Sequence, residues 1–255
     1  MKDYPLHSFY GNIHSSYDRV NRIFTFGRDR SWRKQAAREL LKSAPERVLD
    51  LCTGTGDFLL ELGRQAEKSL KGIRITGFDF SPEMLEEARR KLEASQGLMA
   101  GTESVFVEGD AREMPFDDGF FDSMGITFGL RNLVYENSGA PLHLQEMNRV
   151  LKAGGELVVL ESSKPENRLW RFFNGIYLRL ILPYLGGLIS GNLKAYQYLA
   201  RSSKNYYTRE EMGAILAAAG FRMKRSRSLF LGSVMLLVLE KRQEEIVYLK
   251  KERWE

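Results

Sequence analysis

Four acidic residues occupy positions where a carboxylate can bind the polar groups of a nucleoside. Asp50 and Asp57 flank a glycine-rich segment, Asp79 closes a second apolar run, and Asp110 follows a third. A ribose offers hydroxyl donors to a carboxylate such as Asp79, and an adenine amino group can donate to Asp110. In open α/β sheets, ligands bind beyond the carboxyl ends of the strands. The pattern therefore predicts a nucleoside-containing cofactor.

The segment Thr53-Gly54-Thr55-Gly56 separates two classes of such cofactors. Its glycines allow a sharp turn and a close approach of the ligand to the backbone. The dinucleotide fingerprint G-x-G-x-x-G requires glycine or alanine at position 59, where this chain has Leu59. Asp57 also places negative charge where a pyrophosphate would bind. S-adenosylmethionine carries a sulfonium and an ammonium group and no phosphate, so the sequence favours it over a nicotinamide dinucleotide.

Alternating apolar runs and helical patterns must position these residues. Such alternation predicts a parallel sheet with right-handed crossovers, here a Rossmann-like, doubly wound α/β fold. The predicted strands are 47–52, 73–80, 104–108, 121–128 and 155–161, and the predicted helices are 32–42, 57–68, 82–94, 142–151 and 209–219.

The last two apolar runs, 223–230 and 233–240, depart from this alternation. Only Leu231-Gly232 joins them, which suits a hairpin, so we expect one antiparallel strand near the C-terminus. We expect one methyltransferase domain over 1–240, comprising a helical N-terminal lid (1–42) and a substrate-side helical insertion (164–206), followed by a charged tail (241–255).

Composition limits the other functions. The net charge of +5 is too small to indicate a nucleic-acid partner. The single cysteine, Cys52, excludes an intramolecular disulfide, and the three histidines lack ligand-like spacing, so no metal site is predicted. The first residues lack the apolar run of a signal peptide, which favours the cytoplasm. The most apolar stretch, 176–189, is interrupted by Arg179, Pro183, Gly186 and Gly187 and is predicted to be too short to span a bilayer as one helix.

The quoted motifs resemble a known family. Residues 50–57 and 77–85 resemble the class I methyltransferases. Three further segments narrow this resemblance to the ubiquinone/menaquinone biosynthesis C-methyltransferase family: Tyr17-Asp18-Arg19-Val20-Asn21, Phe128-Gly129-Leu130-Arg131-Asn132 and Leu160-Glu161-Ser162-Ser163-Lys164-Pro165. The resemblance implies S-adenosylmethionine-dependent C-methylation of a prenylated quinol ring, either demethylmenaquinol or a ubiquinol precursor. From the motifs and this resemblance we predict cofactor contacts at Asp50, Thr53, Gly54, Thr55, Gly56, Asp57, Asp79, Phe80, Met84, Asp110, Ala111, Arg112 and Thr127.

The candidate catalytic residues are Arg131, Asn132, Tyr17 and His14. An arginine does not lose its proton in proteins, so Arg131 is expected to orient a water or stabilise a ring oxyanion. Asn132 and Tyr17 would position the hydroxyl, and His14 is the alternative base because its pKa lies near neutrality. The chain departs from the family at three substrate-side positions, where it has Ser162, Asn192 and Arg201.

The insertion 167–198 has aromatic and aliphatic residues at helical intervals, interleaved with arginines. Such a stripe is usually core, but it also suits a polyprenyl tail and a peripheral contact at the inner face of the membrane. A homodimer is also compatible with the sequence. Two other functions stay open: methylation of another small molecule, a phospholipid amine or RNA, and cofactor binding without catalysis.

Overall fold

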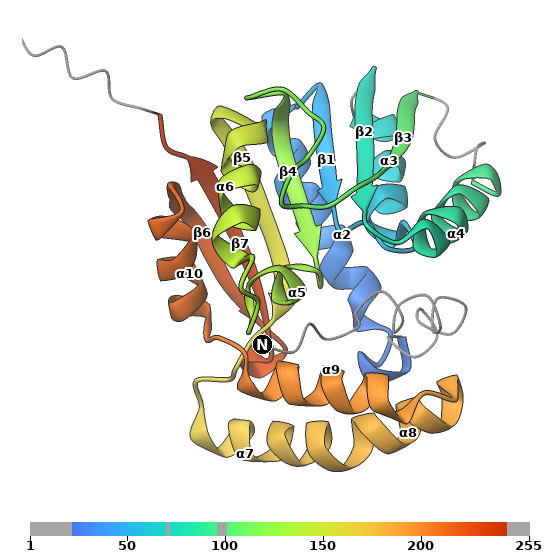
Figure 1. Ribbon diagram of the computed structural model, residues 1–255, viewed down its shortest axis with the longest axis vertical. Helices are drawn as coiled ribbons and strands as arrows, with labels where there is room; N and C mark the ends of the chain where they lie inside the picture. The colour runs from blue at the N-terminus through green and yellow to red at the C-terminus, as the bar shows by residue number, and fades with distance from the viewer. Residues whose placement is uncertain (1–21, 70–71, 96–100, 244–255) are drawn as a thin grey trace, which may run out of the picture.

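A single seven-stranded sheet forms the centre of the molecule. The computed structural model describes residues 22–69, 72–95 and 101–243. The strands lie in the order β3-β2-β1-β4-β5-β7-β6 (Figure 1). They are β1 (Arg47–Leu51), β2 (Ile73–Asp79), β3 (Thr102–Glu108), β4 (Phe121–Thr127), β5 (Leu151–Ser162), β6 (Phe221–Leu229) and β7 (Val234–Lys241).

The predicted fold class is confirmed, including the antiparallel strand. All pairings among strands β1 to β5 are parallel, whereas β7 runs antiparallel to both β5 and β6. A turn at Phe230–Gly232 connects β6 to β7 in place of a crossover helix. Strand β5 begins at Leu151, earlier than expected, because it continues through the glycine pair at 154 and 155. The strand order reverses between β1 and β4, which is where ligands bind in such sheets.

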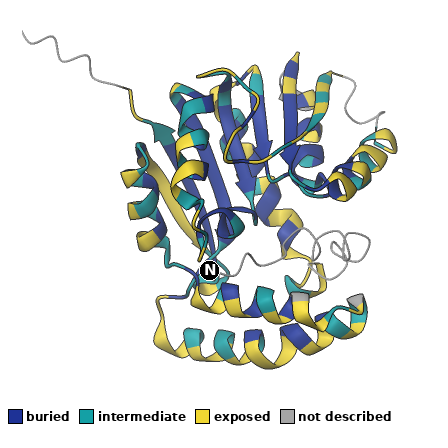
Figure 2. Cartoon of the chain, in the orientation of Figure 1, coloured by how far each residue is buried: buried dark blue, intermediate teal, exposed yellow. Residues whose placement is uncertain are grey.

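Helices cover both faces of the sheet. Residues of α2, α3, β1 and β7 form one buried cluster, and residues of α5, α6 and α10 pack on the other face. The central strands are dark blue in Figure 2 because both of their faces are covered. These helices are α2 (Arg28–Leu40), α3 (Asp57–Ser69), α4 (Pro82–Glu93), α5 (Leu130–Val134), α6 (Ala140–Val150) and α10 (Arg209–Ala218).

The helical insertion forms a separate layer near α5 and α2 (Figure 1). It consists of α7 (Arg168–Ile176), a π-helical turn (Tyr177–Ile181), α8 (Leu182–Ser190) and α9 (Leu193–Asn205). Leu178 and Leu182 pack against Ala200 of α9. The outer face of α7 and α8 is exposed (Figure 2).

The prediction that the apolar stretch is too short to span a bilayer is wrong as regards length. The helical run Arg168–Ile189 is continuous over 22 residues and has a mean hydropathy of 1.4 in its most apolar window, enough to cross a membrane by length and composition alone. Pro183 lies in the first turn of α8, directly after the π-helical turn, and the run continues through it. Gly186 packs against the Tyr196 ring, so it serves a close helix contact.

Candidate active site

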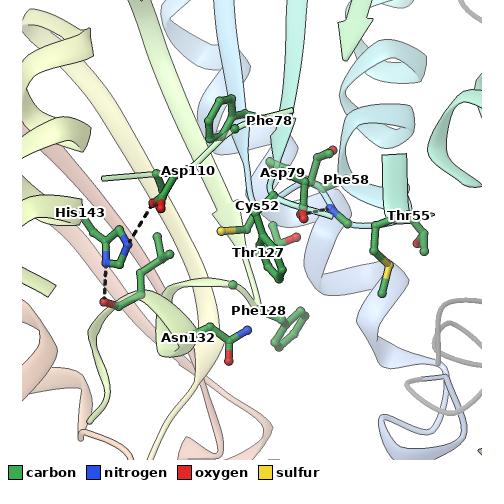
Figure 3. Close-up of a pocket in the computed structure, with 18 of the residues that line it drawn as sticks. Cys52, Thr55, Phe58, Phe78, Asp79, Asp110, Thr127, Phe128, Asn132 and His143 are labelled. Carbon is green, nitrogen blue, oxygen red and sulfur yellow. Dashed lines mark hydrogen bonds and ion pairs between the residues drawn. The ribbon is translucent and has the colours of Figure 1, made fainter. Parts of the chain in front are cut away.

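A cavity of about 360 Å³ lies at the carboxyl ends of β1 to β4, where the strand order reverses (Figure 3). Its volume is within the range of small-molecule sites, roughly 300–1,000 Å³. Of the thirteen predicted cofactor residues, eleven line it: Thr53, Gly54, Thr55, Asp57, Asp79, Phe80, Met84, Asp110, Ala111, Arg112 and Thr127. Asp50 and Gly56 do not.

The glycine turn after β1 is bent sharply at several residues. Gly54 and Gly56 have φ of 54° and 80°, and Cys52 has φ of 55°. A Cβ at Gly56 would approach the Cβ of Ala88 to 3.0 Å, so this glycine brings the turn close to α4. Gly56 therefore shapes the cavity wall without lining the cavity. Burial raises the pKa of the Cys52 thiol well above its ordinary value, so Cys52 remains a neutral packing group.

Asp79 ties the turn to the end of β2. One of its carboxylate oxygens accepts a hydrogen bond from the backbone N–H of Gly54 at 2.8 Å, drawn as a dashed line in Figure 3. The other accepts from the backbone N–H of Ser81 at 3.0 Å. Ser81 in turn caps α4 by accepting from the N–H of Met84. The carboxylate is therefore fixed by backbone N–H groups on both sides, at the wall of the cavity.

Asp50 lies beneath the cavity. It is fully buried, and one of its carboxylate oxygens accepts a hydrogen bond from the Thr53 hydroxyl at 2.6 Å. The other oxygen, Oδ1, is buried without a hydrogen-bond partner. Burial raises the pKa of Asp50 to about 7. Its influence on a ligand is therefore exerted through charge and through Thr53, which does line the cavity.

Asp57 forms an ion pair with a lysine of the next helix, α4. The Lys91 ammonium donates to Asp57 at 2.7 Å and to the Thr55 hydroxyl at 3.0 Å. Burial raises the pKa of Asp57, but the Arg33 and Lys91 charges outweigh it and the net shift is downward. Asp57 is thus an anion whose charge is largely balanced at the start of α3.

A separate cluster of charged and polar side chains lies after β3, at the other end of the cavity. The Asp110 carboxylate accepts from Nε of Arg112 at 2.9 Å, and the hydrogen bond lowers the pKa of Asp110. The ring of His143 is 4.0 Å from Asp110 and hydrogen-bonded to the Leu133 carbonyl (Figure 3). Burial lowers the pKa of His143, which keeps this imidazole neutral at pH 7.

The end of β4 separates the cavity from a neighbouring one of about 150 Å³. Phe128 and Arg33 line both cavities. Arg131 lines the second cavity and Asn132 the first, so the two consecutive catalytic candidates face different spaces.

Arg131 belongs to a buried ion pair. It is buried and pairs with the buried Glu161 at 3.4 Å. The same guanidinium nitrogen donates to Ser162 at 2.7 Å and Ser203 at 3.1 Å. Ser162, one of the departures from the family, therefore serves as a hydrogen-bond acceptor for Arg131.

The structure adds lining residues that the sequence did not single out, among them Arg33, Phe58, Phe78 and His143. Arg33 had a recognisable signal, because it lies one turn before Ala36 and Ala37 on the apolar face of a predicted helix. His143 had none, since its partner Asp110 is distant in sequence. Two catalytic candidates, Tyr17 and His14, lie outside the described residues.

Sequence comparisons identify the family. The profile of the ubiE/COQ5 methyltransferase family matches residues 1–239. A demethylmenaquinone methyltransferase from Thermus thermophilus is 44% identical over 216 residues, covering 84% of this chain and 92% of the relative. A demethylmenaquinone methyltransferase from Deinococcus radiodurans is 39% identical, covering 94% of both chains. The ubiquinone/menaquinone biosynthesis C-methyltransferase UbiE from Geotalea daltonii is 37% identical, covering 94% of this chain and 97% of the relative.

Solved structures agree on the fold. A SAM-dependent methyltransferase from Aquifex aeolicus has a TM-score of 0.52 at 20% identity and covers 80% of this chain and 88% of its own. The mitomycin 7-O-methyltransferase MmcR has a TM-score of 0.61 at 18% identity, covering 91% of this chain and 60% of its own. The [4+2]-cyclase SpnF scores 0.60 at 19% identity, covering 84% and 80%, so the fold alone does not specify the reaction. The match to the family profile specifies the type of reaction. The chain belongs to the ubiE/COQ5 methyltransferase family and is a methyltransferase.

Proposed function

We propose that this protein transfers a methyl group from S-adenosylmethionine to a ring carbon of a prenylated quinol, with demethylmenaquinol as its preferred acceptor and a ubiquinol precursor as the alternative. The carrying observation is a pair of adjoining cavities at the strand-order reversal, one lined by the acidic strand ends and the other by Arg131. The two most similar of the relatives above, from Thermus and Deinococcus, are named for demethylmenaquinone, which favours the naphthoquinol.

The larger cavity fits the methyl donor. Asp79 would accept from the ribose hydroxyls, and Asp110 lies one strand further along, where the adenine would bind. The buried Oδ1 of Asp50 has no hydrogen-bond partner, so a nearby positive charge would stabilise the ionised carboxylate. When bound, S-adenosylmethionine supplies an electrophilic methyl group attached to a sulfonium.

The smaller cavity suits the quinol ring. Trp32, Phe128 and Phe230 offer aromatic surface. Ser162 and Ser163 also line this cavity, and their hydroxyls are hydrogen-bonded to Arg131 and to the Gly232 carbonyl, respectively. Because Phe128 and Arg33 line both cavities, a ring held there lies next to the methyl donor's reacting end. Alignment of two reactants can supply about 7–11 kcal/mol of the barrier.

The reaction forms a bond between the ring carbon and the methyl carbon, breaks the methyl–sulfur bond, and releases the proton from the ring carbon. Ionisation of a ring hydroxyl increases electron density on that carbon. Arg131 would stabilise the resulting oxyanion or orient a water beside it, and Asn132, with Tyr17, would position the hydroxyl. His14 is the alternative base, and general-base assistance typically contributes about 10²- to 10⁴-fold.

The test is incubation with labelled S-adenosylmethionine and one acceptor at a time: reduced demethylmenaquinone, a reduced ubiquinone precursor, or phosphatidylethanolamine. We expect label in the naphthoquinol. Label in the phospholipid, or donor binding without transfer to any acceptor, would contradict the proposal.

Arg131→Lys tests the proposed role at the ring. A lysine preserves the positive charge beside Glu161 but not the planar guanidinium, so we expect kcat to fall at least tenfold while affinity for S-adenosylhomocysteine is unchanged. Arg74→Lys is the control, because Arg74 forms an exposed pair with Glu103 at the sheet edge. Unchanged kcat in Arg131→Lys would remove Arg131 from the mechanism.

We further propose that the outer face of α7 and α8 rests on the cytoplasmic surface of an anionic membrane, from which a prenylated substrate would enter. Leu169, Phe172 and Leu188 are 68%, 63% and 83% exposed. Arg168, Arg179 and Lys194 are exposed in the same layer, which matches an anionic lipid surface. Leu178 and Leu182 on the opposite side pack on α9, so the helix lies against protein and would not be surrounded by lipid.

Flotation with phosphatidylglycerol vesicles tests this contact. Trp170 also lies on α7, but its indole N–H donates to the Ser233 hydroxyl and so faces the protein, which makes it unsuitable for testing membrane contact. Phe172→Ser/Leu188→Ser should lose vesicle binding, whereas Leu142→Ser, at an exposed leucine of α6, should retain it. Equal flotation of all proteins would overturn the proposal. If the double variant instead converts a dimer to a monomer in sedimentation, the face joins two copies of the chain.

A further inference from the structure

Arg33 holds an unusual position on α2. Its side chain is nearly buried, yet it lines both the larger and the smaller cavity. Its Nη1 donates to the buried Asp29 at 2.8 Å, and its guanidinium carbon lies 5.4 Å from the centre of the Phe128 ring. Nε is buried without a hydrogen-bond partner in the described part of the chain. A buried guanidinium with unused donors has capacity for an anionic ligand.

The basic side chains that line the larger cavity divide between its two ends. Among the described residues these are Arg33, Arg112 and His143. Arg112 and His143 are both next to Asp110, after β3. Arg33 of α2 lies at the opposite end of the cavity, next to Phe128, the residue that follows β4. Lys91 does not line this cavity, and its ammonium is bound to Asp57 and Thr55.

This distribution of basic groups predicts which part of the methyl donor binds at each end of the cavity. If the adenine binds near Asp110 and the ribose near Asp79, the amino-acid part of the methyl donor extends toward β1 and β4. That part carries an α-carboxylate, and a buried carboxylate requires a cationic or hydrogen-bonding partner. The acids near Arg33 cannot bind a carboxylate. Asp29 is the ion-pair partner of Arg33, and Asp57, whose pKa is lowered by the charges of Arg33 and Lys91, is hydrogen-bonded to Lys91.

We propose that Arg33 binds the α-carboxylate of S-adenosylmethionine and so fixes the methionine end of the donor beside Phe128, which lines both cavities. This inference rests on the proposed function. It assigns to α2 a ligand contact in addition to its packing on the sheet. Arginine suits this role because its guanidinium retains its charge when buried and can pair with two carboxylates at once.

The test compares two ligands on one protein. Decarboxylated S-adenosylmethionine retains the sulfonium and the amine and lacks only the carboxylate. We expect the wild type to bind S-adenosylmethionine about ten- to a hundredfold more tightly than the decarboxylated compound in calorimetry. In Arg33→Gln this ratio should fall to near one, because only the carboxylated ligand loses a partner. The ratio cancels any general loss of fold, which affects both ligands equally.

Two further variants serve as controls that separate loss of the carboxylate contact from a general effect on folding or binding. Arg33→Gln leaves Asp29 buried and unpaired, so Asp29→Asn/Arg33→Gln removes both charges and should give the same ratio. Arg112→Gln, at the adenine end, should change both dissociation constants by the same factor. A ratio near one in the wild type, or an undiminished ratio in both Arg33 variants, would overturn the assignment while leaving the proposed function intact. Failure of the wild type to bind either ligand would instead overturn the proposed function.

Discussion

At the scale of single residues, the site depends on four carboxylates that are held by different partners. Asp79 is held by backbone N–H groups, Asp57 is paired with Lys91, and Asp110 with Arg112. Asp50 differs because burial without sufficient compensation raises its pKa to about 7. Asp50 is therefore expected to titrate near neutrality, whereas the pKa values of Asp57 and Asp110 are lowered.

The raised pKa of Asp50 makes stability depend on pH. Its ordinary pKa is 3.8, so between about pH 4 and 7 the folded chain holds a proton that the unfolded chain has released. The free energy of unfolding should therefore fall as pH rises through this window, by on the order of 2–4 kcal/mol from this group. Urea unfolding of the wild type and Asp50→Asn at several pH values measures the difference. Parallel curves would show that Asp50 does not titrate in this window.

At the scale of elements, two turns approach each other at the wall of the larger cavity. Cys52 after β1 and Phe128 after β4 both have positive φ, of 55° and 58°. A Cβ added at Gly129 would lie 2.5 Å from the Cβ of Cys52, so the turns meet only because position 129 has no side chain. The strand-order reversal alone does not form the cavity, and the close approach of these turns completes it.

Gly129→Ala should destabilise the protein by about 1–3 kcal/mol because the added methyl overlaps Cys52. Cys52→Gly/Gly129→Ala should recover most of this loss, since glycine removes the opposing Cβ and accepts the positive φ. A double-mutant cycle from urea unfolding measures the coupling. Gly175→Ala in α7 is the control, because its added Cβ meets no atom within 4 Å, and it should not destabilise. Additive effects at 52 and 129 would contradict the proposed contact.

At the scale of the whole molecule, the cavity joins elements from both buried clusters. Its lining includes Phe58 of one cluster and Phe78 and Leu133 of the other. A ligand bound there contacts four strand ends and cannot bind the unfolded chain in the same way. The structure therefore predicts that the methyl donor stabilises the domain as a unit.

S-adenosylhomocysteine at a hundred times its Kd should add about 2.7 kcal/mol to the free energy of unfolding. For a chain of this size that corresponds to a rise in Tm of roughly 5–10 °C. Differential scanning calorimetry checks the shift. Asp79→Asn should reduce it at the same ligand concentration, whereas Glu86→Gln on the exposed side of α4 should not. A full shift in Asp79→Asn would argue against the ribose contact.

The sequence by itself determined the class of the fold and the order of its elements. Alternating strand and helix signals depend on neighbouring residues, and so does the short link at Leu231-Gly232 that placed one strand antiparallel. The acids at the strand ends could be found for the same reason, since the carboxyl ends of parallel strands share one edge of the sheet. Local sequence signals failed at the insertion, where a long helical run contains a proline and two glycines, and where Gly186 lies against the Tyr196 ring of another helix.

Only the tertiary structure decided which of these residues face a ligand. Asp50 and Asp57 are equivalent in sequence, on either side of one turn, yet the first is buried beneath the cavity and the second lines it. Arg131 and Asn132 are adjacent but face different cavities, and Arg33 reaches both from a distant helix. Burial and partner distances depend on contacts between segments far apart in the chain, and a pattern of neighbouring residues contains no information about them.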